Sequence, residues 1–196
     1  MTMLPIAPLM IEHRIIERMI GIIKDEIETL KVTKNPNAAF IDSTVDFFRM
    51  YADATHHGKE EDILFRELKK KNLSPEHKAQ MENLINDHII GRNTIAELVG
   101  ARNSYFSGDA GAVETIIKKM QLLTELYPKH IEKEDKNFFT PIMKYFTPEE
   151  QLAQLEEGHI FDRKMIHKKY DKLVGELEEK RNIAPPKRQP NWLDFL

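Results

Sequence analysis

Apolar residues recur at intervals of three and four along nearly the whole chain, and this spacing limits the possible folds more than any other feature. The residues that interrupt it are clustered in short segments such as Thr33–Asn37 and Ser107–Asp109. Between these segments the spacing predicts helices over residues 9–31, 38–71, 75–106, 110–145 and 148–180. Strand patterns are nearly absent, so the sequence predicts an all-α fold.

Local signals mark several helix ends. Ser74 followed by Pro75 predicts an N-cap with proline in the first turn, and His77, in the same turn, is expected at the surface. Thr147 and Glu150 have the spacing of a capping box and predict the start of the fifth helix. Pro128 is expected to kink or split the fourth helix because proline removes a backbone hydrogen bond.

Long helices joined by short connections fold most readily as an up-down-up-down four-helix bundle. We therefore expect residues 1–146 to form the bundle and residues 147–181 to form an additional C-terminal helix packed on its outside. Residues 182–196 are rich in proline and predict an irregular tail. Two aromatic residues in this tail, Trp192 and Phe195, could fold back on the bundle or bind a partner chain.

The composition excludes several kinds of protein. The formal net charge is only -3 although 31% of the residues are charged, so we expect no nucleic-acid partner. The absence of cysteine excludes disulfides, thiolate metal sites, iron–sulfur clusters and a cysteine nucleophile. No run approaches the roughly 18 apolar residues of a membrane span, and the N-terminus lacks the pattern of a signal peptide. We therefore expect a cytoplasmic protein that does not associate with membranes.

One pattern of histidine, glutamate and phenylalanine occurs twice, on the second and the fourth predicted helices. Each copy reads His-x-x-x-Glu-x-x-x-x-Phe, and the copies span His56–Phe65 and His130–Phe139. A histidine that follows an acidic residue precedes the copies by 43 and 42 residues, respectively: these are His13, after Glu12, and His88, after Asp87. The two halves of the bundle therefore form an internal repeat of a two-helix unit.

The spacing within each copy predicts a metal site. Residues four apart lie on one face of a helix, so each histidine and glutamate can point to the same place. All four histidines interrupt faces that are predicted to be buried, where an unpaired carboxylate would need a cation or a proton. Imidazole and carboxylate are ligands that suit iron and manganese. The sequence therefore predicts a pair of metal ions with the ligands His13, His56, Glu60, His88, His130 and Glu134.

The doublet His56-His57 leaves a second register open, because His57 and Glu61 are also four residues apart. Helical steps back from His57 give Asp53, Arg49 and two further aspartates, a row that is typical of a solvent-facing side. We therefore favour His56 with Glu60 as the inward-facing pair. Phe65 and Phe139, which occupy equivalent places in the two copies, are expected to pack beside the site.

These motifs resemble the hemerythrin-like, or HHE cation-binding, family of di-iron four-helix bundles, over about residues 8–145. The resemblance implies two iron ions that alternate between Fe2+ and Fe3+ and share an oxo or hydroxo bridge, with manganese or zinc as alternatives. It implies that the four histidines are terminal ligands and that Glu60 and Glu134 bridge the two ions. It also implies that the centre binds a small molecule such as dioxygen, nitric oxide or peroxide.

The sequence departs from the oxygen-carrying hemerythrins at one ligand. They have a fifth histidine one turn before the ligand on the third helix, and this chain has Leu84 there. The residues that could complete the coordination are Glu17, His57, His159 and His167. We expect Glu17, His159 and His167 at the surface.

Three functions remain open from the sequence. The first is a di-iron protein that binds, senses or scavenges the small molecule. The second is a di-iron oxidase or peroxidase, which the missing ligand at Leu84 favours because it leaves an ion under-coordinated. The third is a regulatory or interaction module with a structural metal, whose partner would bind at the C-terminal helix or the tail. The sequence leaves the oligomeric state open.

Overall fold

The computed structural model describes the backbone of residues 4–180 and the side chains of residues 4–165 and Lys169. The described chain is helical and contains no strand, which confirms the all-α class for these residues. No helix within residues 4–180 is both long and apolar enough to cross a membrane. The predicted tail over residues 182–196, including Trp192 and Phe195, lies outside the described residues, and so does the side chain of His167.

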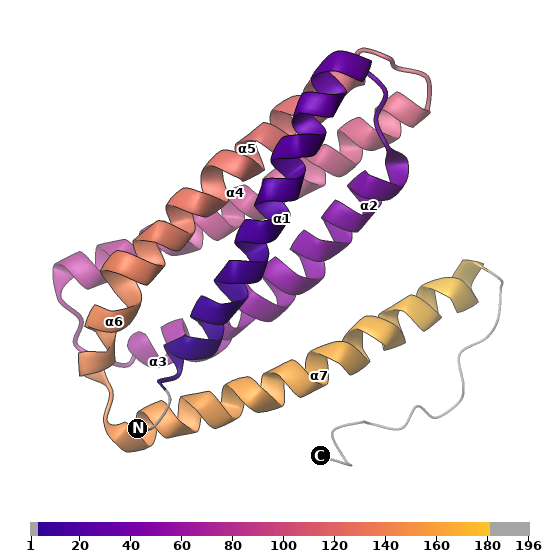
Figure 1. Cartoon of the computed structure of the whole chain (residues 1–196). Coiled ribbons are helices and arrows are strands. Elements are labelled where there is room, and N and C mark those ends of the chain that lie inside the picture. The colour runs from indigo at the N-terminus through magenta and orange to yellow at the C-terminus, as the bar shows by residue number, and fades with distance from the viewer. Residues whose placement is uncertain (1–3, 181–196) are drawn as a thin grey trace.

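Four rods lie side by side, and a fifth helix runs along their outside (Figure 1). The first rod is α1 (Ile6–Thr33), the third is α4 (Pro75–Phe106), and the added helix is α7 (Pro148–Lys180). The other two rods combine several kinds of helix. The second contains α2 (Ala38–Asp46), the π-helices η1 (Phe47–His57) and η2 (Glu60–Phe65), and α3 (Arg66–Leu68). The fourth contains α5 (Ala112–Glu132), the π-helix η3 (Lys133–Phe138), α6 (Phe139–Ile142) and the 3-10 turn η4 (Met143–Tyr145).

The contacts between rods follow this arrangement. The helix α5 packs against α1 and α4, and η1 packs against the same two helices from the second rod. The added helix α7 packs mainly against η1 and η2. The segment that α7 covers is therefore the one that carries the first copy of the repeated motif.

The predicted caps form as hydrogen-bonded structures. The Ser74 hydroxyl accepts a hydrogen bond of 3.2 Å from the backbone N–H of His77, at the start of α4. The Thr147 N–H donates to the Glu150 carboxylate over 2.9 Å, and the Glu150 N–H donates to the Thr147 hydroxyl over 3.3 Å. These bonds satisfy N–H groups that have no partner within the helix.

Two local features differ from what the sequence predicts. Of the two alternatives expected at Pro128, a kink or a split, the split does not occur, because α5 runs unbroken from Ala112 to Glu132. Its packing against α1 and α4 offsets the loss of one backbone hydrogen bond. His77 is buried rather than exposed, because Tyr145 covers the first turn of α4 and its hydroxyl lies 2.7 Å from Nδ1 of His77. That contact joins residues 68 positions apart, and no local pattern indicates it.

The apolar core consists of two clusters. One cluster includes Ile16, Ile23 and Leu123, and the other includes Leu9 and Phe138. Along α1, buried His13 lies one turn after Leu9 of the second cluster and one turn before Ile16 of the first. A layer of polar side chains therefore separates the two halves of the core.

We predict that the neighbouring substitutions Ile22→Ala and Ile23→Ala have very different effects. Ile23 is fully buried and Ile22 is 53% exposed, although both lie on α1. Ile23→Ala should lower the free energy of unfolding by about 2–5 kcal/mol because it leaves a cavity in the first cluster. Ile22→Ala should change it by less than about 0.5 kcal/mol. Urea denaturation of the metal-free protein measures both values, and equal effects would contradict this account of the core.

Candidate metal centre

Seven polar side chains meet in the layer between the two apolar clusters. All six residues of the predicted set lie there, and His57 lies with them. None of the seven is more than 3% exposed: His13, His56, His57, Glu60, His88, His130 and Glu134. They come from α1, η1, η2, α4, α5 and η3, so every rod contributes to the layer.

The seven residues form two overlapping groups. Within each group, every residue offers one nitrogen or oxygen atom, and these atoms all lie within 4.8 Å of one another. The first group is His57, Glu60, His88 and His130, and the second group is His13, His56, Glu60 and Glu134. Glu60 belongs to both. Glu134 also contacts both, because its Oε2 lies 3.1 Å from Nε2 of His13 and 3.3 Å from Nε2 of His130. Each carboxylate therefore lies between a group of three imidazoles and a group of two.

His56 and Glu60 both point into the centre, as favoured, but the expectation that His57 faces solvent is wrong, because His57 points into the centre as well. His57 is 2% exposed, and its ring stacks on the ring of His88 with centroids 3.8 Å apart. The rod is π-helical here, with wider turns than an α-helix, so the angle between adjacent side chains is smaller. Helical steps of 3.6 residues therefore place His57 on the wrong side of the rod. Glu61, its partner in the rejected register, lies at the edge of the centre with 28% exposure.

Two of the other residues considered for the missing ligand, Glu17 and His159, do not reach the centre. Glu17 is exposed and forms an ion pair of 3.1 Å with Arg14 on the same helix. His159 is exposed on α7. Leu84 is 1% exposed and belongs to the second apolar cluster. The fifth imidazole of the centre is therefore that of His57 on the second rod. In the oxygen-carrying hemerythrins the fifth histidine is on the third helix instead.

The inward-facing atoms of the centre have no hydrogen-bond partner. This is true of Nε2 in all five histidines and of both carboxylate oxygens of Glu60 and Glu134. Buried polar atoms are normally paired, and leaving them unpaired costs free energy. Imidazole nitrogen and carboxylate oxygen are the donors that iron, manganese and zinc accept in proteins. The set therefore fits a pair of metal cations.

The outward-facing nitrogen of each imidazole, Nδ1, donates a hydrogen bond to a carboxylate. These bonds are His13 to Asp135 (2.8 Å), His56 to Glu12 (2.9 Å), His57 to Asp53 (3.3 Å), His88 to Glu61 (2.7 Å) and His130 to Asp87 (3.3 Å). Such a bond keeps the proton on Nδ1 and directs the lone pair of Nε2 inward. It also makes the imidazole a better metal ligand.

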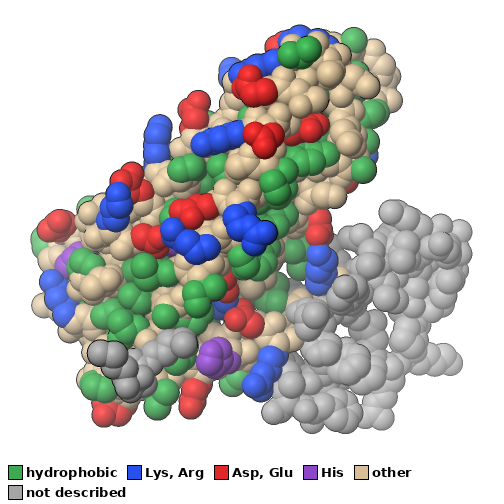
Figure 2. Space-filling view, viewed as in Figure 1, with side chains coloured by type: hydrophobic (Ala, Val, Ile, Leu, Met, Phe, Trp, Pro, Cys, Tyr) green, Lys and Arg blue, Asp and Glu red, His purple; other side chains and the backbone are tan. Residues whose placement is uncertain are grey.

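Basic side chains pair with these carboxylates, and acidic and basic side chains lie next to one another on the face of the molecule that Figure 2 shows. Arg92 pairs with Asp53 over 2.7 Å and with Glu61 over 2.6 Å. The other pairs are Arg14 with Asp135, Lys59 with Glu12, and Lys133 with Asp87. Burial raises the pKa of such carboxyl groups, but the bonded histidines and cations outweigh it. The pKa therefore lies below the ordinary value at Glu12, Glu61, Asp87 and Asp135.

Two phenylalanines border the centre as expected. The ring of Phe139 stacks on that of His13 with centroids 5.7 Å apart, and the ring of Phe65 lies parallel to that of His88 at 6.2 Å. Both phenylalanines are fully buried. They belong to the second core cluster and form its side that faces the imidazoles.

The comparison with protein families gives a match over most of the chain. The model described as the hemerythrin HHE cation binding domain matches residues 4–142. These residues contain all seven side chains of the centre and end before α7. The chain has no significant match among curated proteins or among solved structures.

We predict that the metal-free protein loses stability as the pH rises from about 7 to about 10. Burial lowers the pKa of His13 and His88, but the neighbouring carboxylates outweigh it and raise the pKa to about 10 and about 9. An unfolded histidine titrates near 6.5. The stabilising protons are therefore fully present below pH 6.5 and are lost as the pH rises through the folded values.

The urea midpoint of the metal-free protein across this pH range tests the prediction. His13→Gln should reduce the slope, whereas His159→Gln, on an exposed residue, should leave it unchanged. A midpoint that stays constant or rises with pH would contradict the charge arrangement described here.

Proposed function

Because the chain belongs to the hemerythrin HHE cation-binding family, we propose that it binds two iron ions in this centre and uses them to bind, sense or scavenge dioxygen, nitric oxide or peroxide. The observation that carries the proposal is the set of buried, unpartnered Nε2 and carboxylate atoms that face one another. The same family membership supports an up-down-up-down bundle for the four rods, with α7 as an addition to it.

The two groups of side chains suggest an unequal division of ligands. His57, His88 and His130 would bind one ion, and His13 and His56 would bind the other. Glu60 and Glu134 would bridge the two ions, since each contacts imidazoles of both groups. The ion with two imidazoles has fewer protein ligands and so is the one at which a small molecule would bind.

The protein's own groups would keep this centre dry and fixed. Iron would supply the electrons for binding or reducing the small molecule. The outer carboxylates hold each imidazole in one tautomer, and their basic partners balance the charge. Phe139, which stacks on His13, excludes water from the side with two imidazoles.

The case for an oxidase or peroxidase weakens with His57 in the centre. That alternative depended on the ligand missing at Leu84, and His57 replaces the missing imidazole.

Iron analysis of the anaerobically loaded protein, followed by absorption spectra before and after addition of oxygen, nitric oxide or peroxide, tests the proposal. We expect two iron ions per chain and a spectrum that changes with one equivalent of ligand. Continuous consumption of peroxide would favour the enzyme, and loaded protein with no spectral response would favour a structural metal.

We predict that His57→Ala lowers the iron content below two ions per chain, because it removes one of three imidazoles from its group. The matched control is Glu17→Ala, which should retain two ions because Glu17 is exposed and paired with Arg14. Circular dichroism should show that both variants keep their helix content. Equal iron retention in the two variants would contradict the assignment of His57.

A further inference from the structure

Two equivalent relays of side chains lie on opposite sides of the centre. In each, a carboxylate accepts a hydrogen bond from a histidine of the centre and pairs with the lysine three residues after that histidine. The His56 relay consists of Glu12, His56 and Lys59, and the His130 relay consists of Asp87, His130 and Lys133. The two relays therefore follow the internal repeat of the sequence.

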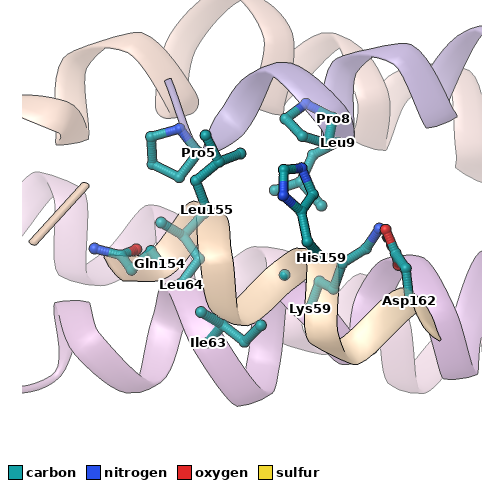
Figure 3. Close-up of a pocket in the computed structure, with 11 residues that line it drawn as sticks. Pro5, Pro8, Leu9, Lys59, Ile63, Leu64, Gln154, Leu155, His159 and Asp162 are labelled. Carbon is teal, nitrogen blue, oxygen red and sulfur yellow. Dashed lines mark ion pairs between the residues drawn. The ribbon is translucent and has the colours of Figure 1, made fainter. Parts of the chain in front are cut away.

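The added helix α7 covers only one of these relays. In the His56 relay, Lys59 is 5% exposed and its Nζ lies 2.6 Å from Oδ1 of Asp162 on α7. Figure 3 shows Lys59 and Asp162 side by side at one edge of a pocket between α7 and the bundle. In the His130 relay, Lys133 is 42% exposed, and its Nζ donates to Asn83 of α4 over 2.7 Å. A carboxylate from α7 therefore completes the first relay, whereas the second contacts solvent.

The packing of α7 against Gly58 holds Asp162 next to Lys59. Phe161, next to Asp162, lies on Gly58, where an added Cβ would be 2.8 Å from the end of the Phe161 ring. Gly58 joins η1 to η2, between His57 and Lys59. The absence of a side chain at Gly58 therefore lets α7 approach the segment that carries three residues of the centre.

We propose that α7 tunes the two-imidazole half of the centre, with Asp162 as a positioning residue that holds Lys59 against Glu12 and thereby orients His56. The inference rests on the proposed function and concerns a helix outside the matched family domain. Without Asp162, the buried ammonium of Lys59 is paired with Glu12 alone. Its full charge then draws the Glu12 carboxylate away from Nδ1 of His56, and His56 becomes a weaker and less fixed ligand.

The rate at which iron leaves the anaerobically loaded full-length protein for a ferrous chelator tests this inference. In Asp162→Asn, one of the two ions should leave about tenfold faster, and the other should leave at the wild-type rate. Adding Lys59→Met to Asp162→Asn should restore the wild-type rate, because it removes the ammonium whose unbalanced charge draws Glu12 away from His56. Asp162→Glu should restore the wild-type rate because it keeps the charge.

The matched control is Glu157→Gln. Glu157 also holds α7 to the bundle, through two contacts of 2.8 and 2.7 Å with Arg66, but it touches neither relay. This variant should release both ions at the wild-type rate. Wild-type release from Asp162→Asn, or equally fast release from Glu157→Gln, would overturn the role of Asp162 while leaving the iron site intact. Wild-type protein that retains no iron would instead refute the proposed function itself, and this inference with it.

Discussion

Two carboxylates and five imidazoles buried between two apolar clusters are the constraint on which the rest of the structure depends. Such groups are costly to bury unless something pairs with them. The molecule arranges charge in successive shells around them. Nε2 and the oxygens of Glu60 and Glu134 face the centre, carboxylates bind each Nδ1, and arginines or lysines pair with those carboxylates toward the surface. Every shell except the innermost is paired within the protein, so the arrangement is complete only with cations at the centre.

The π-helical turns are the reason that the two halves of the centre have different numbers of imidazoles. They occur in both copies of the repeated motif, in η1 and η2 on one rod and in η3 on the other. π-helical turns often occur at functional sites, where they change the direction of side chains. In the first copy they bring the adjacent residues His56 and His57 into the centre together. In the second copy the residue after His130 is Ile131, which packs in the apolar core. One half of the centre therefore has three imidazoles and the other has two.

The sequence predicts the helices and six of the seven central residues, because these depend on local spacing and on the repeat. It also indicates Glu12 and Asp87 as acids near the histidines, but not that Glu12 bonds to His56 of another rod rather than to its neighbour His13. His57 is considered but placed on the solvent-facing side, because an α-helical period does not apply to a π-helix. Asp135, which bonds to His13, is missed because the two lie 122 residues apart. The acid that follows the motif glutamate in both copies, Glu61 or Asp135, is the signal that could have identified this outer shell.

The metal centre lies within residues 4–142, which match the family, whereas α7, which we propose adjusts the centre, lies outside them. The existence of the metal centre is the central claim, and a crystal structure of iron-loaded protein with anomalous scattering measured at the iron edge tests it most directly. The account predicts two anomalous peaks between Glu60 and Glu134, one next to His57, His88 and His130 and the other next to His13 and His56. Peaks elsewhere, or none between these side chains in protein that retains iron, would contradict it.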